Sequence, residues 1–414
     1  MTDSTSSPKY ARYALALLLA VNLLNYIDRQ VLYAVFPLIK ADFRLSDTAL
    51  GFLGSAFMIC YMCSAPLLGW IGDRGNRVRL ASCGIAVWSL ATALSGIAPG
   101  YRSLLAARTV VGIGEASFGT VSPGLISDFF SKERRGRVLS YFYLAIPVGS
   151  AIGYLLGGIL GFHFGWQAAF LIVGAPGLLL AAAVWFLRDP KGKAATAPEL
   201  PGQKPSLAAY GSFLKNRSFV CNTLAMTAMT FAIGGLAQWM PTFLYRIHGL
   251  DVARGNTLFG AVTVLAGITG TLSGGWLGDR LQRKSAKGYL LVSGWGFLLG
   301  IPIAVFAIAS HSLTGCLTAA FFAEFFLFFN TGPLNTVIVN VSPPDRRAMA
   351  FAVNIFFIHA LGDAISPTLL GWFSDLWGLR AALLTTPVAI AAAAGFCFLC
   401  TRYIRDDMER ADQS

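Results

Sequence analysis

Charged residues are scarce in this chain. They make up 13% of its 414 residues, and hydrophobic types make up 55%, whereas soluble domains carry about 25% charged residues. The apolar residues form runs of about 20 or more, the length that a helix needs to cross a bilayer. The alternating pattern of a membrane β-barrel is missing. The composition therefore argues against a soluble domain and a barrel, and predicts an all-α membrane protein.

Several kinds of functional site are also missing from the sequence. No glycine-rich loop ends in Gly-Lys-Ser/Thr to bind nucleotide phosphates, so any transport must be driven by a gradient. Two of the cysteine pairs, Cys60/Cys63 and Cys397/Cys400, have CxxC spacing, but no histidine ligand set accompanies them. Of the four histidines, His359 alone lies well inside a span. This leaves few candidates for the nucleophile–base pair or metal ligands that an enzyme would need. We expect no metal, no cofactor, no enzymatic activity and no nucleic-acid partner, since no soluble basic face is present.

Twelve apolar stretches are long enough to cross a membrane. We expect spans at 12–37, 47–72, 78–98, 103–129, 137–161, 166–187, 218–245, 254–278, 287–309, 313–340, 347–373 and 379–403. If the N-terminus is cytoplasmic, most of the 32 Lys and Arg residues fall in cytoplasmic segments. Those that fall outside or within spans are Lys40, Arg44, Arg102, Arg246, Arg254, Arg380, Arg29 and Arg108. This bias predicts cytoplasmic N- and C-termini and an even number of spans.

One hexapeptide motif occurs twice, at the ends of the second and eighth spans. Its copies are Gly69-Trp70-Ile71-Gly72-Asp73-Arg74 and Gly275-Trp276-Leu277-Gly278-Asp279-Arg280. Two further pairs of segments match at nearly the same offset, 133–135 with 345–347 and 165–169 with 378–382. The duplication predicts two six-helix halves, 1–187 and 218–414. The connection 188–217 reads as a cytoplasmic linker with a short amphipathic helix in its second part.

Twelve spans in two repeats with this motif resemble the major facilitator superfamily, whose signature is Gly-x-Leu-x-Asp-Arg-x-x-Arg. The resemblance implies a gating role for the residues that match it, Asp73, Arg74, Arg77, Asp279, Arg280 and Arg283. Each aspartate can cap the N-terminus of a helix in the opposite half, and the arginines can bind acidic groups nearby. A topology signal alone would explain the basic residues, but it would not explain Asp73 and Asp279 at the same place twice.

Six ionisable residues lie well inside predicted spans, and His359 is a seventh candidate. The six are Asp28, Arg29, Arg108, Glu115, Glu324 and Asp363. A charge at the centre of a bilayer costs at least about 2.5–3.5 kcal/mol. We therefore expect these side chains to line a water-accessible cavity or to form ion pairs.

The first and fourth spans carry four of these charges. Asn25, Arg29 and Tyr33 share one helical face of the first span. Arg108 and Glu115 lie two turns apart on the fourth, about 10 Å along the axis, so each needs a partner on another helix. Either Arg29 pairs with Glu115 or Asp28 pairs with Arg108, and the sequence does not choose between them.

These charges have two interpretations. They can simply pin helices together, although a buried ion pair contributes little to stability. Alternatively, protonation of Glu115 frees an arginine to hold an anionic head group, since its fork binds two oxygens at once. In the tenth span Glu324 lies among phenylalanines, which face lipid or core, or line a channel for an acyl chain. His359 and Asp363 share a face of the eleventh span, as a proton-handling pair or a hydrogen-bonded core pair.

The details of the sequence resemble one family within this superfamily, the spinster proteins. The stretches that carry the resemblance are Arg108 to Ser117, Phe142 to Ser150, Asn330 to Asn340 and Gly362 to Pro367. Asn25-Tyr26-Ile27-Asp28-Arg29 also fits, but it occurs in organic anion/proton symporters as well. The resemblance implies a secondary active carrier of lysophospholipids or sphingoid phosphates that works by alternating access and is coupled to protons.

By matching positions, the resemblance places the head-group site at Asp28, Arg29, Arg108 and Glu115, with contributions from Glu324 and Asp363. We expect substrate contacts at Arg29, Arg108, Glu115, Asn25, Tyr33, Trp239 and Glu324. Proton coupling is expected at Asp28, Glu115, Asp363 and His359. The absence of a glycosylation sequon from the predicted outer loops favours a bacterial inner-membrane protein, and we expect a monomer. The alternative is a small organic-anion or drug transporter of the same fold.

Overall fold

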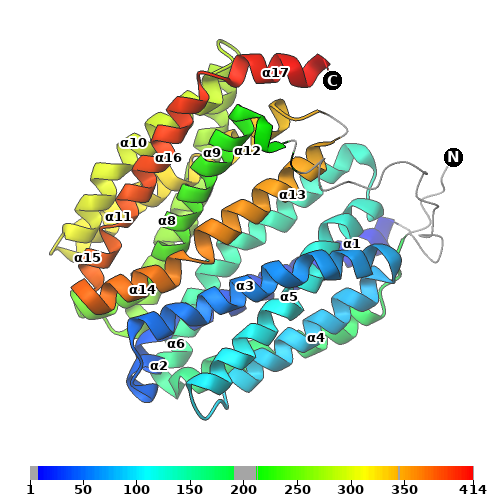
Figure 1. The fold of residues 1–414 in the computed structure, drawn as a ribbon. Coiled ribbons are helices and arrows are strands. Elements are labelled where there is room, and N and C mark those ends of the chain that lie inside the picture. The colour runs from blue at the N-terminus through cyan, green and yellow to red at the C-terminus, as the bar shows by residue number, and fades with distance from the viewer. Residues whose placement is uncertain (1–7, 191–210, 212, 344–345, 414) are drawn as a thin grey trace. The chain divides into compact units, whose positions relative to one another are not determined.

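The computed structural model describes residues 8–190, 211, 213–343 and 346–413. These residues form helices joined by short connections, with no strand in the described part of the chain (Figure 1). Their contacts divide the chain into two compact units, residues 1–201 with 250–260, and residues 202–249 with 261–414. Residues 250–260 group with the first unit, and the division into halves 1–187 and 218–414 stays a prediction. Half of the predicted amphipathic helix, residues 206–210 and 212, lies outside the described residues, and Phe213–Lys215 forms a 3-10 turn.

Among the described residues, the first unit contains six whole helices and the first turns of another, residues 252–260. The six whole helices are α1 (Pro8–Ala34), α2 (Phe36–Phe43), α3 (Asp47–Arg74), α4 (Arg77–Ser95), α5 (Tyr101–Phe129) and α6 (Lys132–Trp185). Polar caps fix two of the starts, because Ser46 accepts from the amide of Ala49 and Asn76 from the amide of Arg79. Each cap gives a backbone amide in the first turn a hydrogen-bond partner, and the apolar stretch that follows is helical.

The remaining described helices belong to the second unit, apart from residues 252–260, and several of them are short or interrupted. They are α8 (Arg217–His248), α9 (Val252–Gln282), α10 (Gly288–Ala309), α11 (Leu313–Phe328), α12 (Thr331–Asn340), α13 (Arg347–Ile358), η4 (His359–Asp363), α14 (Ser366–Trp377), α15 (Leu379–Leu383), α16 (Thr386–Cys400) and α17 (Ile404–Gln413). The predicted span 313–340 is interrupted between α11 and α12. The predicted span 347–373 is interrupted by η4, a single π-helical turn. Such turns are rare and often mark functional positions.

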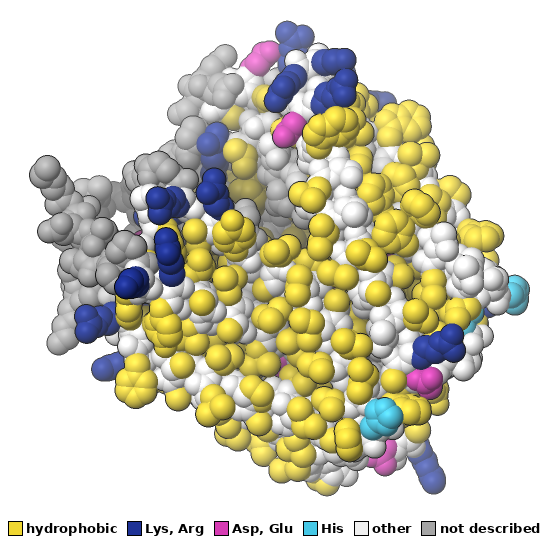
Figure 2. All heavy atoms as spheres, turned by 180° about the vertical axis from the view of Figure 1, so that it is seen from behind, with side chains coloured by type: hydrophobic (Ala, Val, Ile, Leu, Met, Phe, Trp, Pro, Cys, Tyr) yellow, Lys and Arg dark blue, Asp and Glu magenta, His cyan; other side chains and the backbone are white. Residues whose placement is uncertain are grey.

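Ten helices in the described part of the chain are long and apolar enough to cross a membrane. One of them, residues 137–185 of α6, combines two of the predicted spans. The helix α5, which carries Arg108 and Glu115, is not among the ten. Large apolar side chains remain on the surface, such as Leu179 at 76% exposure, and hydrophobic side chains cover most of the face shown in Figure 2. The prediction of an all-α, multi-pass membrane protein is confirmed.

The sequence duplication has a counterpart in the backbone. Gly165 in α6 has φ 83° and ψ 160°, and Gly378 between α14 and α15 has φ 84° and ψ 156°. Both residues adopt a conformation with positive φ that a side chain would strain, and both interrupt the helical conformation at the same place in the repeat. The backbone therefore has the same non-helical conformation at matching positions of the two repeats.

Candidate functional site

Two ion pairs join α1 to α5 inside the first unit. Arg29 donates from Nε to Oε2 of Glu115 over 2.7 Å. Arg108 donates from Nη1 to Oδ1 of Asp28 over 3.1 Å. The sequence offered these pairs as alternatives, but the structure contains both. Because neighbouring residues of α1 point about 100° apart, Asp28 and Arg29 can reach residues two turns apart on α5.

The two pairs differ in how far they are buried. The side chains of Arg108 and Asp28 are 1% and 2% exposed, and Asp28 also accepts a hydrogen bond from Thr92 Oγ1. In the other pair Glu115 is fully buried, whereas the side chain of Arg29 is 16% exposed. Arg29 is therefore the one member of the two pairs whose side chain is partly exposed.

Three aromatic rings surround the guanidinium of Arg29. Its Cζ lies 5.1 Å from the centre of the Tyr26 ring, 5.0 Å from that of Phe57 and 5.1 Å from that of Tyr61. Such contacts stabilise a cation and hold its plane in place. Phe57 and Tyr61 on α3 were not predicted from the sequence to contact Arg29, although their four-residue spacing puts them on one helical face. At Gly112 a Cβ atom would lie 2.4 Å from the carbonyl oxygen of Phe57, so α3 and α5 approach closely.

Two polar atoms beside this pair have no hydrogen-bond partner among the described residues. They are Oε1 of Glu115 and Nδ2 of Asn25, which lies one turn before Arg29. Tyr33, one turn after Arg29, is half-buried with its ring 5.7 Å from that of Phe36. The polar stripe predicted on α1 thus runs along the helix on either side of Arg29.

The candidate residues of the second unit do not form a second charge network of this kind. Glu324 on α11 is 8% exposed and accepts a hydrogen bond from Thr263 Oγ1 over 3.3 Å. Its other oxygen, Oε2, has no partner among the described residues. Trp239 is completely buried and donates from Nε1 to the carbonyl of Pro367 over 3.0 Å, so its ring contacts protein and not an open surface.

His359 and Asp363 interact across the π-helical turn η4. Nδ1 of His359 lies 2.9 and 3.0 Å from the two carboxylate oxygens of Asp363, and the side chains are 29% and 19% exposed. The helix α8 packs closely against this turn, because a Cβ atom at Gly234 would lie 2.6 Å from Cβ of Asp363. The same geometry serves a proton-handling pair or a hydrogen-bonded core pair, so both interpretations stay open.

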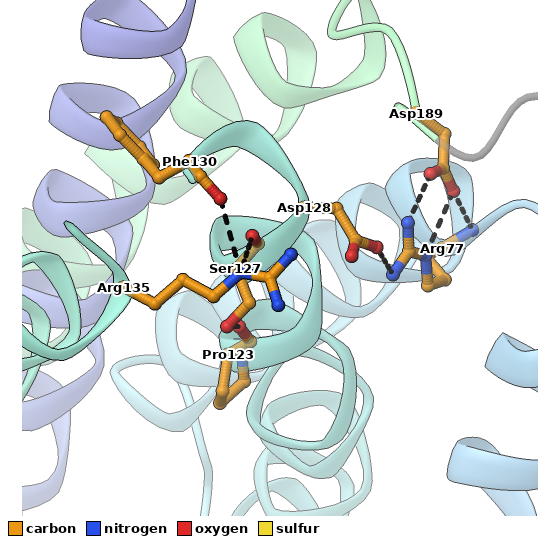
Figure 3. Close-up of polar contacts among 7 residues, drawn as sticks. All are labelled: Arg77, Pro123, Ser127, Asp128, Phe130, Arg135 and Asp189. Atoms are coloured by element: carbon orange, nitrogen blue, oxygen red, sulfur yellow. Dashed lines mark hydrogen bonds and ion pairs between the residues drawn. The ribbon is translucent and has the colours of Figure 1, made fainter. Parts of the chain in front are cut away.

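Arg77 of the repeated motif binds two carboxylates within its own unit (Figure 3). Its Nη1 donates to Asp128 over 2.7 Å, and its Nη2 donates to Asp189 over 2.5 Å. The Nε and the backbone amide of Arg77 also donate to Asp189, each over 3.2 Å. These contacts join the start of α4 to the end of α5 and to the segment after α6. Asp128 and Asp189 were not singled out from the sequence, although both are acidic residues at helix ends.

The other residues predicted to gate make local contacts. The guanidinium of Arg74 lies 4.6 Å from the ring of Trp70, and that of Arg280 lies 5.6 Å from the ring of Trp276. Asp279 accepts a hydrogen bond from the hydroxyl of Tyr289 over 2.7 Å. The side chain of Asp73 lies outside the described part of the structure, and Arg283 takes part in none of these contacts. Their gating role stays a prediction.

Arg135, at the start of α6, makes a further contact near Arg77 in Figure 3. Its Nε donates to the carbonyls of Ser127 and Phe130 over 2.6 and 3.2 Å. These carbonyls belong to the last turn of α5, where helical partners are lacking. Arg135 therefore ties the start of α6 to the end of α5.

The chain is similar to proteins of one transporter family. The family model of the Major Facilitator Superfamily matches residues 18–367. The sphingosine-1-phosphate transporter SPNS2 of Danio rerio is 33% identical over 425 residues, which cover 94% of this chain and 84% of that protein. Protein spinster homolog 1 of Homo sapiens is 36% identical over 392 residues, which cover 89% of this chain and 74% of that protein.

A solved structure has the same fold. It is the crystal structure of a bacterial homolog of the human lysosomal transporter Spinster, in an inward-facing and unoccupied conformation. Its TM-score is 0.87 at 25% sequence identity, and the match covers 97% of this chain and 99% of that one. The likeness therefore extends over both units and the helices that carry the charged residues.

Proposed function

We propose, because this chain belongs to the spinster family of the major facilitator superfamily, that it carries an anionic single-chain lipid across the membrane. Membership of this family identifies the chain as a multi-pass membrane transporter. The substrate we propose is a lysophospholipid or a sphingoid phosphate, moved by alternating access and coupled to protons. Relatives that are named as sphingosine-1-phosphate transporters support this substrate class.

One observation carries the proposal for the anionic head group. The guanidinium of Arg29 is held in place by three rings and one carboxylate, and its side chain is still 16% exposed. A planar guanidinium can donate two parallel hydrogen bonds to a phosphate, and the rings hold its plane before the ligand arrives. In this proposal Asn25 and Tyr33 add polar contacts one turn to either side. Arg108, in its buried pair with Asp28, acts on the head group electrostatically and not by direct contact.

Proton coupling follows from competition for Arg29. With Glu115 ionised, Arg29 is neutralised by a fully buried carboxylate. A proton on Glu115 removes that negative charge, and Arg29 can then hold an anionic head group. Departure of the proton favours the Arg29–Glu115 pair again and weakens the hold on the substrate. We propose His359, Asp363 and Asp28 as further groups on the proton path.

The second unit contributes the remaining substrate contacts that we propose. Glu324 offers a nearly buried carboxyl group whose Oε2 has no partner in the described part of the chain. The apolar tail of the substrate rests against hydrophobic wall, for which the phenylalanines of α11 are candidates. Trp239 becomes available to the tail only if it leaves the carbonyl of Pro367.

The wider setting is also a proposal. The chain consists of two six-helix halves, 1–187 and 218–414, joined by the linker 188–217. The carrier is a monomer in a bacterial inner membrane, with both termini in the cytoplasm. The Asp and Arg residues of the repeated motif latch one of its conformations.

A binding screen tests the substrate class. Purified carrier is titrated with lysophospholipids, sphingoid phosphates and small carboxylates at about pH 5.5 and about pH 7.5, so that the proton concentration differs roughly 100-fold between the two titrations. We expect the phosphate-bearing single-chain lipids to bind most tightly and more tightly at the lower pH. Tighter binding of small carboxylates than of lipids would support the alternative, a small organic-anion or drug transporter of the same fold.

A further inference from the structure

The helix α9 belongs to both compact units. Residues 250–260 group with the first unit and residues 261–414 with the second, although Val252–Gln282 is one continuous helix. The first turns of α9 are therefore packed among helices of the first unit. Since sequence duplication assigns the whole of this helix to the second half, these contacts are not explained by the repeat.

A buried asparagine fastens the first turns of α9 to α1. Asn256 is 2% exposed, and its Nδ2 donates to the carbonyl of Ala34 over 3.0 Å and to that of Val252 over 2.8 Å. Ala34 is the last residue of α1, where carbonyls lack helical partners. The Asn256 side chain thus satisfies a carbonyl at the end of α1 from a helix 222 residues away in sequence.

Close contacts with α6 surround this hydrogen bond. At Gly158 a Cβ atom would lie 2.7 Å from Cβ of Asn256, and at Gly260 a Cβ atom would lie 3.0 Å from the carbonyl of Ala151. The rings of Tyr154 and Phe259 meet edge to face with 5.1 Å between their centres. The small residues let the two backbones approach closely, as in other membrane helix pairs. One face of α9 is therefore fitted closely to one face of α6.

The repeat does not require a polar side chain at this place. The residue 206 positions earlier, at the offset of the Gly-Trp-x-Gly-Asp-Arg motif, is Leu50, which is fully buried and apolar. An asparagine inside a membrane helix costs free energy unless it is hydrogen-bonded. Asn256 is therefore a specific feature of α9 and not a consequence of the shared architecture.

We propose that Asn256 is a conformational latch of the carrier. Its bond to Ala34 and its contact with Gly158 hold the first turns of α9 on the first unit in the conformation described. This inference rests on the proposed alternating-access function, in which the seam that α9 forms with α1 and α6 opens in the other conformation. Opening the seam breaks the bond from Asn256 to Ala34, whereas the bond to Val252 stays within α9. Asn256 thereby sets the population of the closed seam.

Thiol labelling tests the latch without a substrate. Val252 is 4% exposed in the seam, so the V252C variant reports its opening through the rate of reaction with a membrane-impermeant maleimide. The background carries serine in place of Cys60, Cys63 and Cys83, the cysteines that are not buried. One net hydrogen bond is worth about 0.5–1.5 kcal/mol. N256A should therefore raise the labelling rate about two- to tenfold.

Matched controls separate the latch from a general loosening of α9. Thr257 is the next residue and bonds only within its own helix, to the carbonyl of Ala253 over 2.8 Å; T257A should leave the rate unchanged. G158A places a methyl group against Asn256 and should raise the rate, whereas G395A, at a glycine with open space around it, should not.

Equal labelling rates in N256A and the unmodified reporter, or an equal increase in T257A, would overturn the latch. If N256A does not purify as a folded protein, G158A against G395A decides the question. The assay contains no lipid substrate, so a wrong substrate class leaves its result standing. Conversely, a labelling result that overturns the latch would not decide the substrate class, which the binding screen tests separately.

Discussion

Arg29 on α1 and Glu115 on α5 form an ion pair in which the arginine side chain is partly exposed and the glutamate side chain is buried. The carboxylate is fully buried, the guanidinium side chain is 16% exposed, and 2.7 Å separates Nε from Oε2. A proton that binds Glu115 removes the negative charge that neutralises Arg29, and both side chains can stay in place. This asymmetry is the basis of the first two predictions.

Glu115→Gln should abolish the response of uptake to a proton gradient while the protein remains folded. The amide keeps the shape of the carboxyl group but is permanently neutral, so Arg29 no longer gains and loses a partner charge. Uptake into proteoliposomes is measured with and without an imposed pH gradient. Glu409→Gln, at a carboxylate that is 61% exposed, is the matched control and should behave as wild type. Gradient-driven accumulation in Glu115→Gln would show that the proton acts elsewhere.

Arg29→Ala should weaken the binding of anionic lysolipids far more than that of zwitterionic or neutral analogues. Hydrogen bonds to charged groups contribute about 1.5–3 kcal/mol, so the loss is roughly 10- to 150-fold in Kd. Arg29→Lys keeps the charge but loses the fork, and should recover only part of the affinity. Binding is followed by titration with lipids that share one chain and differ in head group. Equal losses for all head groups would instead indicate a structural role for Arg29.

Asp28→Asn should lower the stability of the first unit. Arg108 and Asp28 are 1% and 2% exposed, so the change leaves a buried guanidinium without its counter-charge. Breaking a buried pair in this way costs about 3–5 kcal/mol. Thermal unfolding in detergent measures the loss of stability. The loss in the double variant D28N/R108Q should be smaller than the sum of the losses in the two single variants. Unchanged stability together with a loss of proton coupling would instead indicate that Asp28 takes part in proton transfer and does not stabilise the site.

Asp189→Ala should destabilise the carrier more than Asp128→Ala. Asp189 accepts three hydrogen bonds from Arg77 and its side chain is 7% exposed, whereas Asp128 accepts one and is 25% exposed. Removing one carboxylate from a buried pair leaves the buried guanidinium without that counter-charge, which costs more than breaking an exposed pair worth about 0–1 kcal/mol. Thermal unfolding of the two variants is compared with that of Glu409→Ala, at an exposed pair that should matter little. The reverse order would show that Asp128 is the main partner of Arg77.

The sequence identified the charged residues inside the predicted spans but not how they are paired. Periodicity placed Arg29 and Asp28 on different faces of one helix, and it placed Arg108 and Glu115 two turns apart on another. Helical geometry could go no further, because the pairing depends on how α1 and α5 pack against each other. The rings of Phe57 and Tyr61 around Arg29 were missed for the same reason, since aromatic residues on an apolar helix carry no signal of what they contact.

The amino-acid sequence by itself determined the fold class, the duplicated architecture and the identity of the intramembrane charges. Hydrophobic length and charge placement act along the chain, so they can be read without coordinates. Only the tertiary structure decided that both ion pairs form, that Arg29 has the more open side chain, and that Arg77 binds Asp128 and Asp189. It also decided that Asn256 holds Ala34, because contacts between residues this far apart depend on close packing, which no local pattern in the chain encodes.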